Sequence, residues 1–227
     1  MRRETDKQIC RQDASHGPGG VALKMRYPVF VSFISTGVIL CCLYRRFGGR
    51  MESKMNKCRL REWKISDAKD IARILSNHKI LDNLRDGIPY PYTEKDGEEY
   101  IKRMLLSDKN TTFAFAIDVN GTAVGSIAAF RQENIHDRTA EIGYYLSEDY
   151  WNLGIMTEAV KQLCRYLFEY TNIIRIFAEP FSDNSASCRV LEKAGFHFEG
   201  LLRSNAVKNG RVLDMKMYSL VTEERND

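Results

Sequence analysis

Two Asn-Gly dipeptides, Asn120-Gly121 and Asn209-Gly210, constrain the architecture of this chain more than any other feature. Each lies between two runs of strand-forming residues, a pattern that is typical of a tight β-hairpin. The sequence therefore predicts two antiparallel strand pairs, at residues 113–119 with 123–130 and at residues 196–205 with 212–221. Three further strands are predicted from alternation or a short apolar run, at residues 58–63, 138–146 and 173–179.

Helical spacing of apolar residues, with start and stop signals, fills the intervals between these strands. Helices are predicted from Ser66-Asp67 to about residue 76, from the cap Thr93 to about 106, from 154 to 170, and from 183 to 194. Residues 77–92 have no clear period. The order β-α-α-β-β-β-α-β-α-β-β predicts a mixed α/β (α+β) domain, with a central sheet of about seven strands flanked by four helices.

Charge is distributed unevenly along the chain. Residues 1–57 carry 11 of the 34 Lys and Arg but only 4 of the 30 Asp and Glu, so the rest carries 23 basic against 26 acidic residues. The net charge of +4 thus belongs to the N-terminal segment, and the globular part is mildly acidic. This balance argues against a nucleic-acid partner, and the mean hydropathy of −0.39 excludes a polytopic membrane protein.

Residues 1–55 are predicted to be a poorly ordered extension, followed by one domain at 56–227. The extension contains an uncharged run at 27–44, which is at the lower limit of length for a membrane-spanning helix and includes Pro28 and Gly37. Three interpretations stay open: a membrane anchor, an extension that packs on something, and a true start at Met51 or Met55. The last is favoured, because the first strand begins just after Met55.

The segment from Tyr150 to Ala159 joins a strand to a helix. Backbone N–H groups at such a helix start are free to bind a phosphate, and Gly154 lets the backbone approach a ligand closely. A plain strand-to-helix turn is the alternative interpretation. The next helix begins with Asn184 and Ser187 and ends with Leu191-Glu192-Lys193-Ala194-Gly195-Phe196.

With these segments, the chain resembles the GNAT superfamily of N-acetyltransferases over residues 58–221, and within it the RimJ/RimL type that acetylates ribosomal-protein N-termini. The resemblance is carried by Ala140-Glu141-Ile142-Gly143-Tyr144, the turn with Gly154-Ile155-Met156, the helix from Asn184 to Phe196, and Glu199-Gly200-Leu201-Leu202-Arg203. The family's turn is written Gln/Arg-x-x-Gly-x-Gly/Ala. Here the three positions are Trp151, Gly154 and Met156, so only the middle glycine is retained.

The resemblance implies acetyl-CoA as co-substrate and a primary amine as acceptor. We expect a cytoplasmic enzyme without a metal. The resemblance also implies acetyl-CoA contacts from Tyr145, Leu146, Asn152, Leu153, Gly154, Ile155, Met156, Thr157 and Asn184. Acceptor contacts are expected in the 77–92 loop and on the fourth strand, at Arg85, Asp86, Tyr90 and Tyr144. Relatives often dimerise, which leaves a homodimer open. The histidines outside the N-terminal segment have no partners at metal-ligand spacing.

Two catalytic candidates follow from the same resemblance. Glu141 is the candidate base, because a carboxylate in a partly apolar site has a raised pKa; the alternative is a partner for Arg138. Ser187 is the candidate acid, since the tyrosine that many members carry seven residues after the Asn is Leu191 here. Backbone N–H groups near Leu146 are expected to polarise the thioester carbonyl.

Three functional hypotheses stay open at this point. The first is acetylation of a protein N-terminal amine, and the second is acetylation of a small amine such as a polyamine, an aminoglycoside or an amino acid. The third is a CoA-binding module without turnover. If residues 27–44 are an anchor, the enzyme is tethered to a membrane with its catalytic domain in the cytosol.

Overall fold

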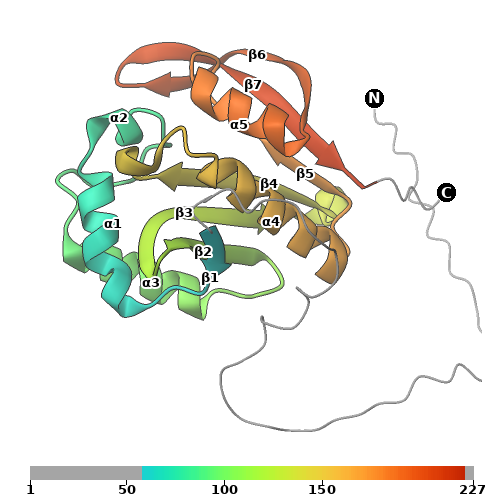
Figure 1. Cartoon of the computed structure of the whole chain (residues 1–227). Coiled ribbons are helices and arrows are strands. Elements are labelled where there is room, and N and C mark those ends of the chain that lie inside the picture. The colour runs from blue at the N-terminus through green and yellow to red at the C-terminus, as the bar shows by residue number, and fades with distance from the viewer. Residues whose placement is uncertain (1–57, 223–227) are drawn as a thin grey trace, which may run out of the picture. The chain divides into compact units, whose positions relative to one another are not determined.

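The computed structural model describes residues 58–222 (Figure 1). The strands are β1 (Cys58–Arg61), β2 (Thr112–Val119), β3 (Thr122–Arg131), β4 (Thr139–Leu146), β5 (Arg175–Ala178), β6 (His197–Lys208) and β7 (Arg211–Val221). The α-helices are α1 (Ala68–Leu75), α2 (His78–Leu81), α3 (Glu94–Leu106), α4 (Ile155–Tyr170) and α5 (Ser185–Ala194). Short 3₁₀ turns lie at Ile65–Asp67, Asn134–His136 and Glu148–Tyr150.

The seven strands form one mixed sheet in the order β1-β2-β3-β4-β5-β7-β6. All neighbours are antiparallel except β4 and β5, which are parallel and joined through α4. Both predicted hairpins are confirmed, because Asn120, Gly121, Asn209 and Gly210 all have the positive φ that such turns require. Figure 1 shows β6 and β7 as a long hairpin at one end of the sheet.

Two hydrophobic clusters cover the two faces of the sheet. One contains buried residues of α4 and α5, and the other contains buried residues of α1, α2 and α3. On β4, Ala140, Ile142 and Leu146 belong to the α4/α5 cluster, whereas Tyr145 packs against the other. Since successive side chains alternate between faces, Glu141 lies on the α1–α3 face of the sheet.

The mixed α/β prediction is confirmed, with one addition and small shifts at element ends. The segment 77–92 is not wholly irregular, because α2 forms one helical turn whose Asn77 cap accepts a hydrogen bond from Lys79 N. A single turn carries too little periodicity to detect from sequence. The 1–55 extension and its 27–44 run lie outside the described residues. Among residues 58–222, no helix is both long and apolar enough to cross a membrane.

Candidate functional site

The turn from β4 into α4 has a backbone shaped to present N–H groups outward. Asn152 and Gly154 have left-handed φ values of 61° and 76°. Gly154 is the N-cap of α4 and supplies no side-chain cap, and the first helical bond runs from Glu158 N to Gly154 O at 3.1 Å. Ile155 and Met156 bury their side chains in the α4/α5 cluster, which anchors the turn. The N–H groups at this helix start are therefore available to an anion.

The strands β4 and β5 separate beside this turn. Their register ends at Glu141↔Phe177, while β4 stays paired with β3 as far as Leu146↔Gly125. Ser147 N donates to Val124 O, and backbone groups of successive residues point to opposite edges of a strand. The N–H groups of Tyr144 and Leu146 therefore point to the β5 edge, into the gap between the two strands.

The aromatic residue at the first position of the turn motif fixes the loop to the end of β4. Trp151 Nε1 donates to the Leu146 carbonyl oxygen at 2.9 Å. The Leu146 carbonyl group points to the β5 edge of the strand. The bond therefore holds the turn beside the gap between β4 and β5. The tryptophan that departs from the family motif thus has a structural role in positioning the turn.

On the α1–α3 face, two carboxylates share one guanidinium beside the gap. Arg85, from the loop after α2, forms an ion pair with Glu141 on β4, and its Nη2 lies 4.0 Å from Glu179 Oε2. Glu179 follows β5 directly and has only 19% of its side chain exposed. Burial, reinforced by the negative charge of Glu141, raises the pKa of Glu179, and Arg85 partly opposes this.

These contacts correct the sequence interpretation at one point and add to it at another. The partner of Glu141 is Arg85 and not Arg138, whose Nε donates to the Asn172 carbonyl oxygen. Burial also raises the pKa of the Glu179 carboxyl group, a residue that the sequence marked only as the end of a strand. The sequence held one signal for Glu179. It stands four residues after Arg175, so alternation along an extended chain places both side chains on the same face of the sheet.

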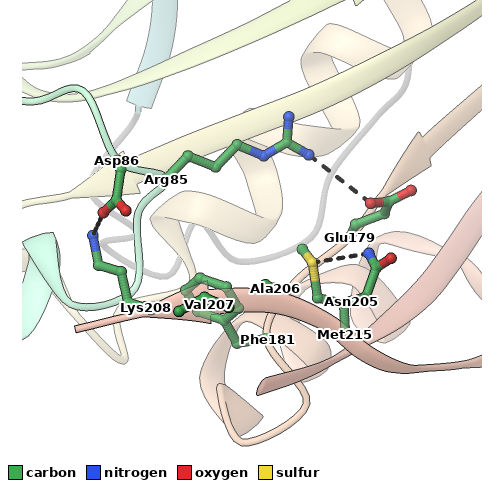
Figure 2. A pocket seen from close by; sticks show the side chains of 9 residues that line it. All are labelled: Arg85, Asp86, Glu179, Phe181, Asn205, Ala206, Val207, Lys208 and Met215. Carbon is green, nitrogen blue, oxygen red and sulfur yellow. Dashed lines mark hydrogen bonds and ion pairs between the residues drawn. The ribbon is translucent and has the colours of Figure 1, made fainter. Parts of the chain in front are cut away.

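Next to this pair lies a pocket of about 260 Å³, shown in Figure 2. Its lining comes from the 85–86 loop, the end of β5 and the β6–β7 hairpin: Arg85, Asp86, Glu179, Phe181, Asn205, Ala206, Val207, Lys208 and Met215. Lys208 Nζ forms an ion pair with Asp86 Oδ1 at 2.7 Å across the rim. Arg85 and Asp86 thus lie together at this pocket, whereas Tyr90 is 58% exposed and contacts the ring of His78 instead.

On the other face, Ser187 lies in the first turn of α5. Its N–H donates to Asn184 Oδ1 at 3.0 Å, so Asn184 caps the helix. The Ser187 Oγ lies 2.9 Å from the Tyr144 hydroxyl. Leu191, at the position of the family's tyrosine, is completely buried in the core. Ser187 and Glu141 therefore lie on opposite faces of the sheet, on the two sides of the β4–β5 gap.

The two neighbouring tyrosines of β4 point to opposite faces of the sheet. Tyr144, expected on the acceptor side, points to the α4/α5 face and Ser187. Tyr145, expected to contact acetyl-CoA, packs its side chain into the α1–α3 cluster, where its hydroxyl is buried. Because side chains alternate along a strand, two neighbouring residues always lie on opposite faces of the sheet.

Among residues 58–222, no group of three or more His, Cys, Asp or Glu side chains is arranged to hold a metal ion. The site therefore consists of a backbone turn, a gap between strands, an acidic pair and a hydroxyl pair.

Comparison with known proteins identifies the family of this chain. A model of the acetyltransferase (GNAT) domain matches residues 57–197. An uncharacterised N-acetyltransferase, p20 of Bacillus licheniformis, is 28% identical over 73% of this chain and 93% of its own length. In Escherichia coli, the ribosomal-protein-serine acetyltransferase is 24% identical (71% of this chain, 97% of its own), and the spermidine N(1)-acetyltransferase is 25% identical (58% and 72%).

Among solved structures, the fold is similar to RimL, a ribosomal-protein alpha-N-acetyltransferase in complex with coenzyme A. The TM-score is 0.66 at 23% identity, over 74% of this chain and 95% of that one. The match to the domain extends over more than half of the sequence and includes the β4–α4 turn, the acidic pair and Ser187. The chain therefore belongs to the GNAT family and is an N-acetyltransferase.

Proposed function

We propose that this enzyme transfers the acetyl group of acetyl-CoA to the amino group at the N-terminus of a protein. The observation that carries the proposal is the gap between β4 and β5, with the Glu141–Glu179 pair on one side and the Ser187 hydroxyl on the other. An acyl donor held in the gap is then open to an amine from one face and to a hydroxyl donor from the other.

The residues present fit acetyl-CoA as the donor. The β4–α4 turn offers uncapped helix N–H groups to a pyrophosphate, and a Cβ added at Gly154 would meet no protein atom within 4 Å, so the turn faces open space. The N–H groups of Tyr144 and Leu146 point to where a thioester oxygen would gain negative charge. Asn184 keeps its amide N–H groups for the pantetheine arm, because the cap uses its oxygen.

On the acceptor side, Glu179 is the proposed proton acceptor, directly or through a water. Its raised pKa brings it closer to the value at which a carboxylate removes a proton from an ammonium effectively. Glu141, paired with Arg85, holds negative charge beside the ammonium. The amine nitrogen, freed of its proton, forms a bond to the thioester carbonyl carbon. As the carbon–sulfur bond then breaks, its electron pair goes to the sulfur, and the Ser187 hydroxyl donates a hydrogen bond to that sulfur.

The charges around the pocket favour a peptide N-terminus over a polyamine. Arg85 and Lys208 balance Glu179 and Asp86 in its lining, and Phe181, Val207 and Met215 add apolar surface. A second pocket of about 250 Å³ shares Phe181 and Lys208 with the first. Its charges also cancel, because Lys208 and Arg211 stand against Asp82 and Asp183. A polyamine needs several uncompensated carboxylates. A peptide needs one, for its terminal ammonium, and an apolar wall for its first side chain.

The test follows release of free CoA thiol by the full-length protein with acetyl-CoA and a panel of acceptors. We expect turnover with peptides that begin with a free Ala or Ser, and none when the same peptides are N-terminally blocked. Spermidine and aminoglycosides are expected to be much poorer acceptors. Turnover with spermidine alone would contradict the peptide proposal, and binding of CoA without turnover on any amine would favour a binding module.

The backbone of the turn gives a prediction for CoA affinity. Gly154→Ala is expected to weaken CoA binding about tenfold. A left-handed alanine costs roughly 1–2 kcal/mol, so the free turn relaxes from this conformation and binding has to restore it. Isothermal titration calorimetry with CoA measures this directly. Gly121→Ala is the matched control, since Gly121 also has a positive φ and open space at its Cβ but lies in the β2–β3 turn. Equal CoA affinity in the two variants would contradict a backbone phosphate site at Gly154.

A further inference from the structure

The hydroxyl of Tyr144 lies against two oxygens of one residue. It is 2.9 Å from Ser187 Oγ and 3.4 Å from the Ser187 carbonyl oxygen, although the two residues are 43 positions apart in sequence. The Tyr144 ring joins the α4/α5 cluster, where the thiols of Cys164 on α4 and Cys188 on α5 lie near its hydroxyl. The hydroxyl pair is thus the polar end of a side chain that is otherwise packed in the core.

The chemistry of this pair limits the directions of its hydrogen bonds. A carbonyl oxygen only accepts, so Tyr144 is the donor in the 3.4 Å contact, whereas either hydroxyl can donate in the 2.9 Å contact. Burial raises the pKa of Tyr144, so its hydroxyl keeps its proton at every working pH. When Tyr144 donates to Ser187 Oγ, the serine's own proton must point elsewhere. Ser187 is only partly buried, so a ligand can approach its side chain.

We propose that Tyr144 is a positioning residue, whose hydroxyl donates to Ser187 Oγ and so turns the serine proton toward the sulfur of CoA. This inference rests on the proposed role of Ser187 and deepens it. A lone serine hydroxyl rotates freely and donates to whichever acceptor is nearest, including a carbonyl one turn back in its own helix. A fixed donor on its oxygen removes that freedom. It also polarises the serine O–H, which makes it a stronger donor to a thiolate.

The proposal predicts an effect on the bound CoA thiol itself, apart from turnover. In the enzyme–CoA complex, a serine proton aimed at the sulfur stabilises the thiolate and lowers the pKa of the CoA thiol. Removing one hydrogen bond to a charged group shifts a pKa by about one unit. We therefore expect Tyr144→Phe and Ser187→Ala each to raise the pKa of bound CoA by about one unit. The ultraviolet absorbance of the thiolate, titrated against pH with and without CoA, measures it.

Steady-state kinetics on the full-length chain provides the second measurement. Tyr144→Phe is expected to lower kcat about tenfold with little change in the KM for acetyl-CoA, because the interaction matters most when charge develops on sulfur. The Tyr144→Phe/Ser187→Ala double variant is expected to be no slower than Ser187→Ala alone, since the tyrosine acts through the serine. Two residues with separate structural roles would instead give additive losses.

Tyr100→Phe is the matched control. The Tyr100 hydroxyl on α3 also lies beside a serine hydroxyl, Ser126 Oγ at 3.3 Å, but Ser126 has no role in the proposed site, so kcat and the CoA thiol pKa are expected to stay at wild-type values. If Ser187→Ala shifts the CoA thiol pKa and Tyr144→Phe does not, the positioning role of Tyr144 is wrong and the role of Ser187 stands. If neither shifts it, both roles fail. Acetyl transfer, measured with the acceptor panel, is a separate result.

Discussion

Replacing Glu179 with glutamine is expected to lower kcat/KM for acetyl transfer by about 10²-fold or more, the usual contribution of a positioned general base. The amide keeps the size of the side chain but cannot accept the proton of the acceptor ammonium. Glu179 is half-buried beside the β4–β5 gap and lines the acceptor pocket. Initial rates with acetyl-CoA and a peptide that begins with a free Ala or Ser provide the measurement.

Two further glutamine variants make this prediction specific. Glu141→Gln is expected to lower the rate less than Glu179→Gln, because Glu141 contributes charge and not proton transfer. Glu98→Gln on α3, which removes an exposed ion pair with Lys102, is expected to leave the rate unchanged. If Glu141→Gln abolishes turnover and Glu179→Gln does not, Glu141 is the base, as the sequence first suggested.

The pH dependence of the rate tests the same roles of Glu179, Glu141 and Arg85, by the direction in which each variant moves the acidic limb. Only the carboxylate form of Glu179 accepts a proton, so the rate of the wild-type enzyme falls as the pH drops through the raised pKa of Glu179. Glu141→Gln removes a negative charge that raises this pKa, so the acidic limb is expected to move to lower pH. Arg85→Gln removes a positive charge that lowers it, so the limb is expected to move to higher pH. The Arg85 shift is expected to be small, because its side chain is 65% exposed and screened by solvent.

Arg61→Ala is expected to destabilise the domain by about 3–5 kcal/mol, which is the usual effect of leaving a buried charge without its partner. Arg61 on β1 bonds to both oxygens of Asp67, at 2.7 and 2.9 Å, and its Nε bonds to Asp118 at 2.7 Å. The two carboxylate side chains are only 7% and 3% exposed. Thermal unfolding of the full-length protein is expected to show a midpoint lower by roughly 10 °C.

The neighbouring arginine provides the control for this loss. Arg59 lies on the same strand and contacts the same Asp118 at 3.3 Å, but its side chain is 68% exposed. Arg59→Ala is therefore expected to lower stability by less than about 1 kcal/mol. Similar losses for the two variants would mean that the number of arginine contacts, and not burial, governs the stability of this corner.

Much of the fold follows from local signals that the sequence states directly. The hairpins at Asn120-Gly121 and Asn209-Gly210 form because these residues adopt positive φ at low cost. Thr93 caps α3 by accepting from Asp96 N, and Gly195 ends α5 in a left-handed conformation. The order of the elements along the chain was predictable because each of these signals acts within a few residues. A four-residue helix such as α2 was not, since one turn has almost no period.

The candidate site divides along the same line. The β4–α4 turn is one short segment, and Asn184 and Ser187 form another, so the chemistry of each was visible in the sequence. The role of Glu179, the Arg85–Glu141 pair and the Tyr144–Ser187 contact were not. Each joins residues 38 to 94 positions apart, through the parallel register of β4 and β5 and the faces to which their side chains point.

The sequence by itself determined the family, the order of elements and the backbone of the turn, because these depend on local conformational preferences. Only the tertiary structure decided that the Glu179 carboxyl group has a raised pKa and that Tyr144 reaches the serine. Burial and neighbouring charge set a pKa, and both come from residues that folding brings together. A one-residue difference along a strand exchanges one face of the sheet for the other, and so places Tyr144 at the hydroxyl pair and Tyr145 in the opposite core.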